Sequence, residues 1–197
     1  MDFSHSDDRR MLGDTLQRFV AENCGPFVRA KAAKTAPGYD PALWARFAEL
    51  GVIGALFTAD QGGFGGGGFD LMVVFEQLGH GLVAEPFLSA LMAGRALAAA
   101  GRADVVEAII GGTSVIAFAH EEAEAGYDQH YVTTRARRDR DEWIVDGTKA
   151  VIRDAEGASA LLVSVRTSGA VDEADGISLF LVPAGAEGLS VRGYPCV

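Results

Sequence analysis

The first half of the chain carries apolar residues at the three- and four-residue spacing of amphipathic helices. The first such stretch follows Ser4 and Asp7, whose spacing matches an N-terminal capping box. A second stretch begins with Asp40 as N-cap and Pro41 in the first turn, and it ends at Gly51. The apolar residues of the first stretch, which share one helical face, are Met11, Leu12, Leu16, Phe19 and Val20. Two helices are therefore predicted before residue 52.

The same spacing, together with glycine stop signals, predicts three more helices. They cover about residues 70–78, 86–101 and 103–110. The last one ends at the pair Gly111-Gly112, after which short β-like stretches replace the helical pattern. These stretches, which are rich in β-branched residues or alternate in polarity, are residues 114–120, 131–137, 160–165, 177–182 and 189–192.

A β-hairpin is predicted around the dipeptide Asp146-Gly147. Residues 143–145 and 148–152 flank it, and Asp-Gly supplies the positive φ angles of a type I′ turn. We interpret the arginine-rich run at residues 135–140 as a solvated strand end and hairpin tip.

The order of these elements predicts the α+β fold class. An all-helical N-terminal domain is expected over residues 1–111, and a central β domain is expected over residues 112–197. We expect the β domain to be an antiparallel, barrel-like sheet that is incomplete where this sequence ends.

Composition narrows the class of protein. With 49% hydrophobic and 22% charged residues, the 197-residue chain is an ordinary globular protein. Its net charge of −10 disfavours binding to nucleic acid and to anionic membrane surfaces. The two cysteines, Cys24 and Cys196, lie far apart, which favours a reducing compartment. Because the N-terminus is polar and acidic and Arg95 interrupts the apolar run at residues 87–100, we expect a soluble, cytoplasmic protein.

A glycine tract at residues 63–68 formally matches the G-x-G-x-x-G pattern of dinucleotide-binding proteins, and Glu85 lies at about the distance of a ribose-binding acid. That chemistry requires a strand that runs directly into the tight turn and a helix that follows it. Here the apolar run 52–57 follows a predicted helix, and residues 58–62 separate it from the glycines. We interpret the tract as a flexible loop between two helices.

Metal and serine-nucleophile chemistry are not expected. No G-x-S-x-G motif occurs. Glu121 and Glu122 follow a histidine, but neighbouring side chains of a strand point to opposite faces, so three clustered metal ligands are not available. The four histidines, which are spread over the chain, are His5, His80, His120 and His130.

Several short motifs occur in a fixed order along the chain. In the first half they are residues 49–56, residues 61–65, Asp70, residues 75–79 and Glu85-Pro86. In the second half they are Asp146-Gly147-Thr148-Lys149 and the run Gly-Ile-Ser-Leu-Phe-Leu-Val-Pro at residues 176–183. In this order they resemble the acyl-CoA dehydrogenase family over essentially the whole chain. The family's usual proline near Ala59 is missing.

The resemblance implies a helical domain, a central β domain and a C-terminal helical bundle. It also implies FAD-dependent α,β-dehydrogenation of an acyl-CoA thioester, in which a glutamate removes the α-proton and flavin N5 accepts hydride from the β-carbon. That glutamate belongs to the C-terminal bundle of the family, so we expect no catalytic base in this sequence. Family members assemble as dimers of dimers, and a homo- or hetero-oligomer is expected.

The resemblance also assigns positions to flavin contacts. The family's Thr-Glu-Pro-x-x-Gly-Ser-Asp corresponds to residues 121–128, where Glu121 replaces the threonine donor and Tyr127 replaces the serine. The family's Trp-Ile-Thr has become Val151-Ile152-Arg153. An ionised carboxylate cannot donate a hydrogen bond and repels an anionic reduced flavin. The candidate cofactor-binding residues are Phe118, His120, Glu121, Gly126, Tyr127, Val151, Ile152 and Arg153.

Three functions stay open on this basis. In the first, the chain is an active dehydrogenase subunit whose flavin is held mainly by backbone groups, with Arg153 balancing the charge of the reduced flavin. In the second, it is the flavin-free partner subunit of a heteromeric acyl-CoA dehydrogenase, as for steroid side chains, which the four substitutions favour. In the third, it is a scaffold without flavin chemistry, which predicts no flavin absorbance with any partner.

Overall fold

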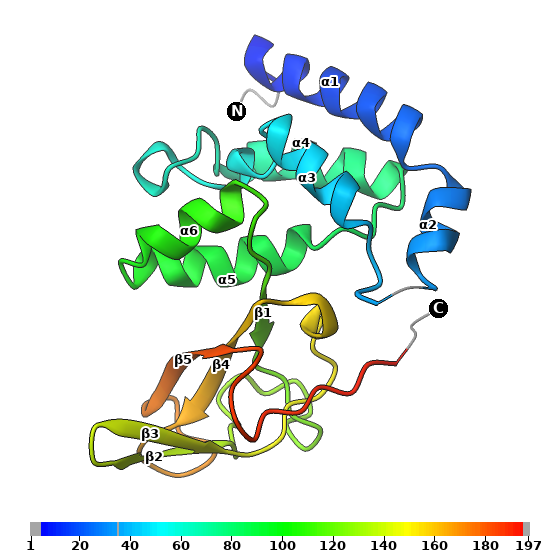
Figure 1. Cartoon of the computed structure of the whole chain (residues 1–197). Helices are drawn as coiled ribbons and strands as arrows, with labels where there is room; N and C mark the ends of the chain where they lie inside the picture. The colour runs from blue at the N-terminus through cyan, green and yellow to red at the C-terminus, as the bar shows by residue number, and fades with distance from the viewer. Residues whose placement is uncertain (1–4, 35, 195–197) are drawn as a thin grey trace. The chain divides into compact units, whose positions relative to one another are not determined.

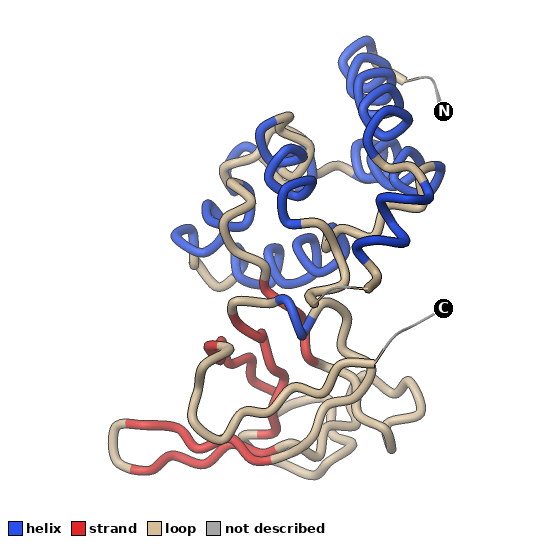
Figure 2. Tube along the Cα trace, turned by 45° about the vertical axis from the view of Figure 1, so that its right-hand side comes forward, coloured by secondary structure: helices blue, strands red, loops and turns tan. Residues whose placement is uncertain are grey.

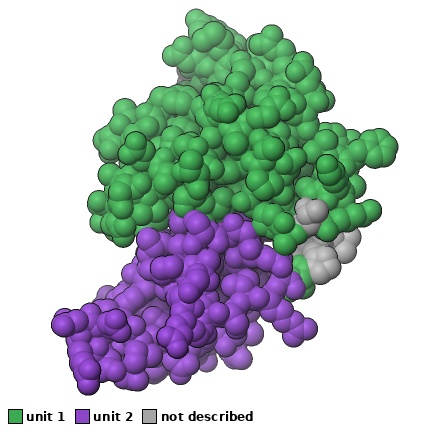
Figure 3. All heavy atoms as spheres, viewed as in Figure 1, with its two compact units in different colours: residues 1–115, 194–197 green, residues 116–193 purple. Residues whose placement is uncertain are grey.

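The computed structural model describes residues 5–34 and 36–194 (Figure 1). The chain forms two compact units (Figure 3). The first contains the described residues up to Val115 together with Tyr194, and the second is Ile116–Gly193.

The first unit is all-helical, and each of the five predicted helices is confirmed. One further helix, α2, was not predicted; it begins at Pro26, where proline is tolerated because the first N–H of a helix has no intrahelical partner. The helices are α1 (Asp7–Asn23), α2 (Pro26–Ala32), α3 (Pro41–Glu49), α4 (Gly68–His80), α5 (Phe87–Ala99) and α6 (Ala103–Ile110), with the short 3-10 turns η1 (Gly54–Leu56) and η2 (Ala59–Gln61).

The helix ends follow the predicted capping chemistry. The Asp40 carboxylate accepts hydrogen bonds from the backbone N–H of Ala42 at 2.9 Å and of Leu43 at 3.4 Å, and Gly51 ends the helical segment with φ at +81°. At α1 the N-cap is Ser6, whose side chain accepts from a backbone N–H. The cap that the sequence suggested, Ser4, lies outside the described residues.

An aromatic cluster joins three of these helices. The ring of Phe47 on α3 lies 4.9 Å from that of Phe19 on α1 and 5.0 Å from that of Phe87 on α5, centroid to centroid. Trp44 meets Phe87 edge-on at 5.0 Å. Each such pair adds about 1 kcal/mol to the burial of its apolar surface, so this cluster organises the core of the helical unit.

The glycine tract is a loop whose backbone is closely packed and hydrogen-bonded. It connects η2 to α4, so the predicted helix-to-helix position is confirmed. The backbone N–H groups of Gly65 and Gly66 donate to carbonyls of the preceding segment, each at 2.9 Å. A Cβ on Gly63 would lie 2.3 Å from the carbonyl oxygens of Gly54 and Phe57. Glycine is therefore needed here for close backbone packing.

Arg95, which interrupts the apolar run of α5, secures the same loop. Its guanidinium donates to the carbonyl oxygen of Leu56 at 3.1 Å and also to that of Gly66. No helix among the described residues is long and apolar enough to cross a bilayer.

The second unit is built on one five-stranded sheet (Figure 2). All seven residues of its central strand, β4, are buried. The strands are β1 (Ile116–Ala119), β2 (Arg135–Asp139), β3 (Glu142–Asp146), β4 (Ala160–Arg166) and β5 (Ile177–Pro183), with the short 3-10 turn η3 (Ala155–Gly157) before β4.

The α+β class is confirmed, but the sheet is mixed and open, not antiparallel and barrel-like. β4 pairs antiparallel with β5, with Leu162 opposite Leu181. It pairs parallel with β1, with Phe118 opposite Leu162, and β2 joins it parallel through a single bridge. The long connection over residues 120–159 makes the parallel pair possible, since parallel strands need a crossover and cannot be joined by a tight turn.

The hairpin lies one strand earlier than predicted. It is formed by β2 and β3, and its tip at Arg140 confirms the interpretation of the arginine-rich run. The predicted turn at Asp146-Gly147 is wrong, because residues 148–152 form no strand. A Cβ on Gly147 would lie 2.5 Å from Thr134 Oγ1, so this glycine serves a close approach. The strand predicted over residues 189–192 is likewise absent from the described structure.

Candidate functional site

A buried ion pair lies beneath the predicted site loops. Lys149 Nζ is 2.8 Å from Glu122 Oε1, and the two side chains are 9% and 1% exposed. The same ammonium donates to the carbonyl oxygen of His120 and to Ser164 Oγ, each at 3.0 Å. All three of its N–H donors therefore have acceptors, as burial of a lysine requires.

The Glu122 carboxylate is held equally completely. It accepts hydrogen bonds from the backbone N–H of Thr133 at 2.8 Å and of Thr134 at 3.0 Å. Both threonine hydroxyls also donate to it, that of Thr134 at 2.6 Å. The ion pair thereby ties together three stretches of chain: the residues after β1, those before β2 and those after β3.

The protonation states follow from these contacts. Burial alone raises the pKa of Glu122, but hydrogen bonds from Lys149, Thr133 and Thr134 outweigh it and lower the pKa to about 2. Burial lowers the pKa of Lys149, and the hydrogen bond and charge of Glu122 offset only part of this effect. Burial, and then the charge of Lys149, lower the pKa of His120, whose Nδ1 lies 2.9 Å from Ser164 Oγ.

The structure brings two of the predicted site segments together. Phe118 at the end of β1 stacks on His120, with ring centroids 5.9 Å apart. The backbone N–H of Ala150 donates to the carbonyl oxygen of Glu121 at 2.8 Å. This bond places residues 150–153 beside the end of β1.

Gly126 and Tyr127 lie in a turn between these segments. Among the described residues, neither forms a hydrogen bond to the end of β1 or to residues 150–153. The φ angles of both are positive, +58° and +70°, and the Tyr127 side chain is 94% exposed. Their place in a site is therefore a prediction that the geometry leaves untested.

The substituted side chains face solvent. Val151 is 69% exposed, and Glu121 and Arg153 are exposed as well, while Ile152 is half-buried. Within the described ranges, the side chains of Glu121, Tyr127 and Arg153 form no hydrogen bond or ion pair.

Val151 has an unusual backbone conformation. Its φ of +56° lies in the left-handed region, which a β-branched residue rarely adopts. Such a conformation costs about 1–3 kcal/mol and persists only where the surroundings impose it. Here the neighbouring Lys149 and Ala150 are both held by partners near the end of β1.

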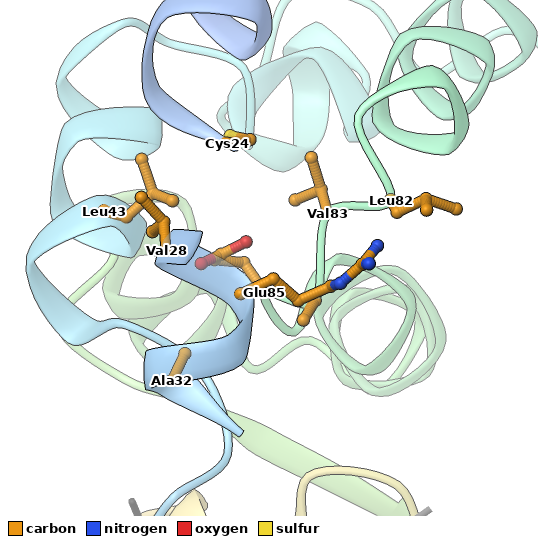
Figure 4. A pocket seen from close by; sticks show the side chains of 9 residues that line it. Cys24, Val28, Ala32, Leu43, Leu82, Val83 and Glu85 are labelled. Atoms are coloured by element: carbon orange, nitrogen blue, oxygen red, sulfur yellow. The ribbon is translucent and has the colours of Figure 1, made fainter. Parts of the chain in front are cut away.

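A small pocket of the helical unit shows different chemistry (Figure 4). The Glu85 carboxyl lies among apolar side chains that include Val28, Leu43 and Val83, and burial raises its pKa. Burial, and then the charge of Glu85, raise the pKa of the Cys24 thiol to about 11. Cys24 is therefore protonated near neutral pH and is a poor nucleophile. Within the described part of the chain, no group of three or more His, Cys, Asp or Glu side chains is placed to hold a metal ion.

Comparison with known proteins assigns both units to domains of one protein family. The family model "Acyl-CoA dehydrogenase, N-terminal domain" matches residues 6–114, and "Acyl-CoA dehydrogenase, middle domain" matches residues 117–195. The chain belongs to the acyl-CoA dehydrogenase family, as the motif order predicted.

Individual relatives agree with this assignment. The chain is 32% identical to "Acyl-CoA dehydrogenase fadE12" of Mycobacterium tuberculosis (strain CDC 1551 / Oshkosh), over 95% of this chain and 50% of the relative. It is 29% identical to "Benzylmalonyl-CoA dehydrogenase" of Aromatoleum aromaticum (strain DSM 19018 / LMG 30748 / EbN1), over 97% and 51%. A solved variant of the "Tcur3481-Tcur3483 steroid ACAD" matches with a TM-score of 0.81 and 29% identity, over 93% and 50%. The chain spans about half the length of the curated relatives it matches.

At the positions that the resemblance assigns to flavin contacts, the side chains of this chain do not fit FAD. Glu121 offers a carboxylate where a hydroxyl donor is needed, and Arg153 offers a large cation in place of a small hydroxyl. Val151 provides no aromatic surface. In contrast, the buried ion pair of Glu122 and Lys149 has a full set of hydrogen-bond partners. The sequence had singled out Lys149 and Glu122 as motif residues but gave them no role, and it did not identify Thr133, Thr134 or Ser164.

Proposed function

We propose that this chain is a subunit of an acyl-CoA dehydrogenase assembly and that it does not hold FAD at its own site. The assembly oxidises an acyl-CoA thioester between its α- and β-carbons. The observation that carries the proposal is the chemistry of the four exposed side chains at Glu121, Tyr127, Val151 and Arg153. Family membership supports the reaction class.

The substitutions weaken flavin binding in two ways. An ionised Glu121 accepts but cannot donate hydrogen bonds, and its charge opposes the negative charge of a reduced flavin. Val151 removes the flat ring against which a flavin packs in the family. We assign no catalytic base to the described residues. The acyl group, from a lipid or a steroid side chain, is part of the proposal, as are the dehydrogenase subunits with which the chain assembles.

A heteromeric assembly is the arrangement that we favour. The solved relative at 29% identity pairs two named components, Tcur3481 and Tcur3483, in one steroid ACAD. In such an assembly one subunit supplies the complete flavin site while its partner supplies surfaces and substrate contacts. The substituted site of this chain suits the second role.

A second candidate is an ordinary flavoprotein subunit whose cofactor is held by backbone groups. The observation in its favour is that the backbone near the site is held by hydrogen bonds. Lys149 and Ala150 both donate to carbonyl groups that follow β1. Arg153 would then balance the charge of a reduced flavin.

The experiment that separates these functions is a visible spectrum of the complete native protein, purified alone and co-expressed with other acyl-CoA dehydrogenase subunits of its source. We expect flavin bands only in the presence of a partner, at about half occupancy per subunit, because the flavin carries the redox step and one subunit type binds it. Bands near one per chain without a partner would establish the second candidate. If no flavin is found with any partner and acyl-CoA is not oxidised, the result would indicate that the chain is a scaffold without flavin chemistry.

A further inference from the structure

The backbone of the substituted site is held by groups that lie below it. Lys149 Nζ reaches the carbonyl oxygen of His120 at 3.0 Å and the Glu122 carboxylate at 2.8 Å. Because Glu122 is in turn bound by Thr133 and Thr134, the end of β1 and the residues after β3 share one buried anchor.

The exposed side chains form no hydrogen bond or ion pair with this anchor. Glu121 contributes its backbone carbonyl, which accepts from the N–H of Ala150, and its exposed carboxylate acts on Lys149 through its charge, without a hydrogen bond. Tyr127, Val151 and Arg153 are exposed, and no hydrogen bond or ion pair joins their side chains to the rest of the described chain. The surface of the site and its support are therefore built from different residues.

Val151 shows that the support dictates the backbone. Valine is a poor choice for a φ of +56°, so its own preference did not produce this conformation. The preceding residues, Lys149 and Ala150, are fixed by hydrogen bonds to His120 and Glu121. The conformation is imposed from the anchored side.

We propose that Glu122 and Lys149 are positioning residues that keep residues 118–122 and 149–153 in a flavin-binding backbone arrangement, although the exposed side chains no longer suit a flavin. The inference rests on the proposed function, since it takes the present site to be flavin-free. It means that the site is latent: replacing the exposed side chains alone restores binding.

The test uses the full-length native protein with its natural partner subunit. FAD retained per chain is measured by visible absorbance after desalting, and the Kd for FAD is measured by quenching of flavin fluorescence. We expect a restored variant to bind FAD at least about tenfold more tightly than the wild type. The restored variant carries Glu121→Thr, Tyr127→Ser, Val151→Trp and Arg153→Thr.

The positioning role is tested in the restored background. Adding Glu122→Gln together with Lys149→Gln replaces the ion pair by neutral hydrogen-bonding groups and leaves no unpaired buried charge. We expect this change to abolish the tenfold gain while the protein still folds. Lys149→Arg, which keeps the charge, should retain part of the gain.

The matched control is Arg166→Lys. Arg166 is a buried cation of β4 in the same unit, and its guanidinium donates to four backbone carbonyls of other loops, those of His130, Val171, Glu173 and Asp175. This change lowers the stability of the unit but keeps every hydrogen bond of Glu122 and Lys149, and the Arg166 backbone N–H still donates to the carbonyl oxygen of Thr134. FAD affinity of the restored variant should therefore stay within about twofold.

The outcomes separate the two proposals. A wild-type chain that binds one FAD without a partner overturns the proposed flavin-free function, and the positioning role is then read directly from the paired Gln variant of the wild type. A folded restored variant with unchanged FAD affinity overturns the latent site. Retention of the gain in the paired Gln variant, or its equal loss in Arg166→Lys, overturns the positioning role.

Discussion

Lys149 Nζ lies 2.8 Å from Glu122 Oε1 in the interior of the β unit, although 27 positions separate the two residues in the sequence. Charged groups are buried at a large desolvation cost, which only complete pairing and hydrogen bonding offset. Both residues meet that condition, with Thr133, Thr134 and Ser164 as further partners. Replacing either residue is therefore expected to lower the free energy of unfolding of the β unit.

Acid should destabilise the β unit through Glu122. Its pKa falls from an ordinary value of 4.5 to about 2 in the folded protein. A carboxylate with a lowered folded pKa contributes stability above about pH 4.5 and loses it as the pH falls towards 2. Because solvent screens part of this interaction, the contribution is at most about 3 kcal/mol. Urea unfolding between pH 7 and pH 2.5 should show this loss, and Glu122→Gln should flatten it, whereas Glu124→Gln at an exposed position keeps the wild-type profile. An unchanged profile in Glu122→Gln would refute the assignment.

Lys149→Met should lower the free energy of unfolding by about 3–5 kcal/mol, because it leaves a buried carboxylate without its counter-ion. Adding Glu122→Gln should recover part of that loss. The comparison is a double-mutant cycle measured by urea denaturation. As a control, Arg102→Met removes an exposed ion pair with Asp104 and should have no measurable effect. Equal effects of Lys149→Met and Arg102→Met would contradict the buried-pair geometry.

Gly63→Ala should destabilise the helical unit by at least about 2 kcal/mol, since its Cβ would lie 2.3 Å from two backbone carbonyl oxygens. Gly68→Ala is the matched control from the same tract. No atom lies within 4 Å of a Cβ at Gly68, the first residue of α4, so alanine there should be neutral or stabilising by about 0.5–1 kcal/mol. Thermal unfolding of both variants measures the difference. Equal tolerance at both positions would show that the loop is flexible enough to accept a Cβ at Gly63.

Val151→Gly should raise the free energy of unfolding by about 1 kcal/mol, because glycine adopts a φ of +56° without steric cost. Ile152→Gly, one residue further along the chain, removes a half-buried side chain and should destabilise. Chemical denaturation of the two variants gives the comparison. A loss of stability in Val151→Gly would mean that the backbone at this position is not strained.

Much of the helical unit could be predicted because its signals are local. Asp40, Pro41 and Gly51 lie within or beside the helix whose ends they define, and α6 spans residues 103–110 as predicted. The predicted alternation of buried and exposed side chains leading into β2 is also confirmed, since Val132 and Thr134 are buried while Thr133 and Arg135 are exposed. A helix cap or a strand face depends on residues within one or two turns, so a short window of sequence contains its cause.

The hairpin shows where local signals fail. Asp146-Gly147 has the composition of a type I′ turn, but the following Lys149 is drawn into the interior by Glu122 and Ser164. Residues 148–152 therefore leave the β2–β3 ladder, and Gly147 packs against Thr134. The contacts of the buried Lys149 therefore outweigh the local preference of Asp146-Gly147 for a tight turn.

The sequence by itself determined the α+β class, the position of five of the helices, the strands predicted at residues 160–165 and 177–182, and the family, because each depends on short-range pattern or on the order of motifs. Only the tertiary structure decided the parallel pairing of β1 with β4, the place of the hairpin, and the anchoring of the site by Glu122 and Lys149. The pairing of β1 with β4 joins residues 44 positions apart, such as Ile116 and Ala160, and the ion pair joins residues 27 positions apart. Their stability comes from loop closure, desolvation and complete hydrogen bonding in the folded interior, which no local pattern encodes.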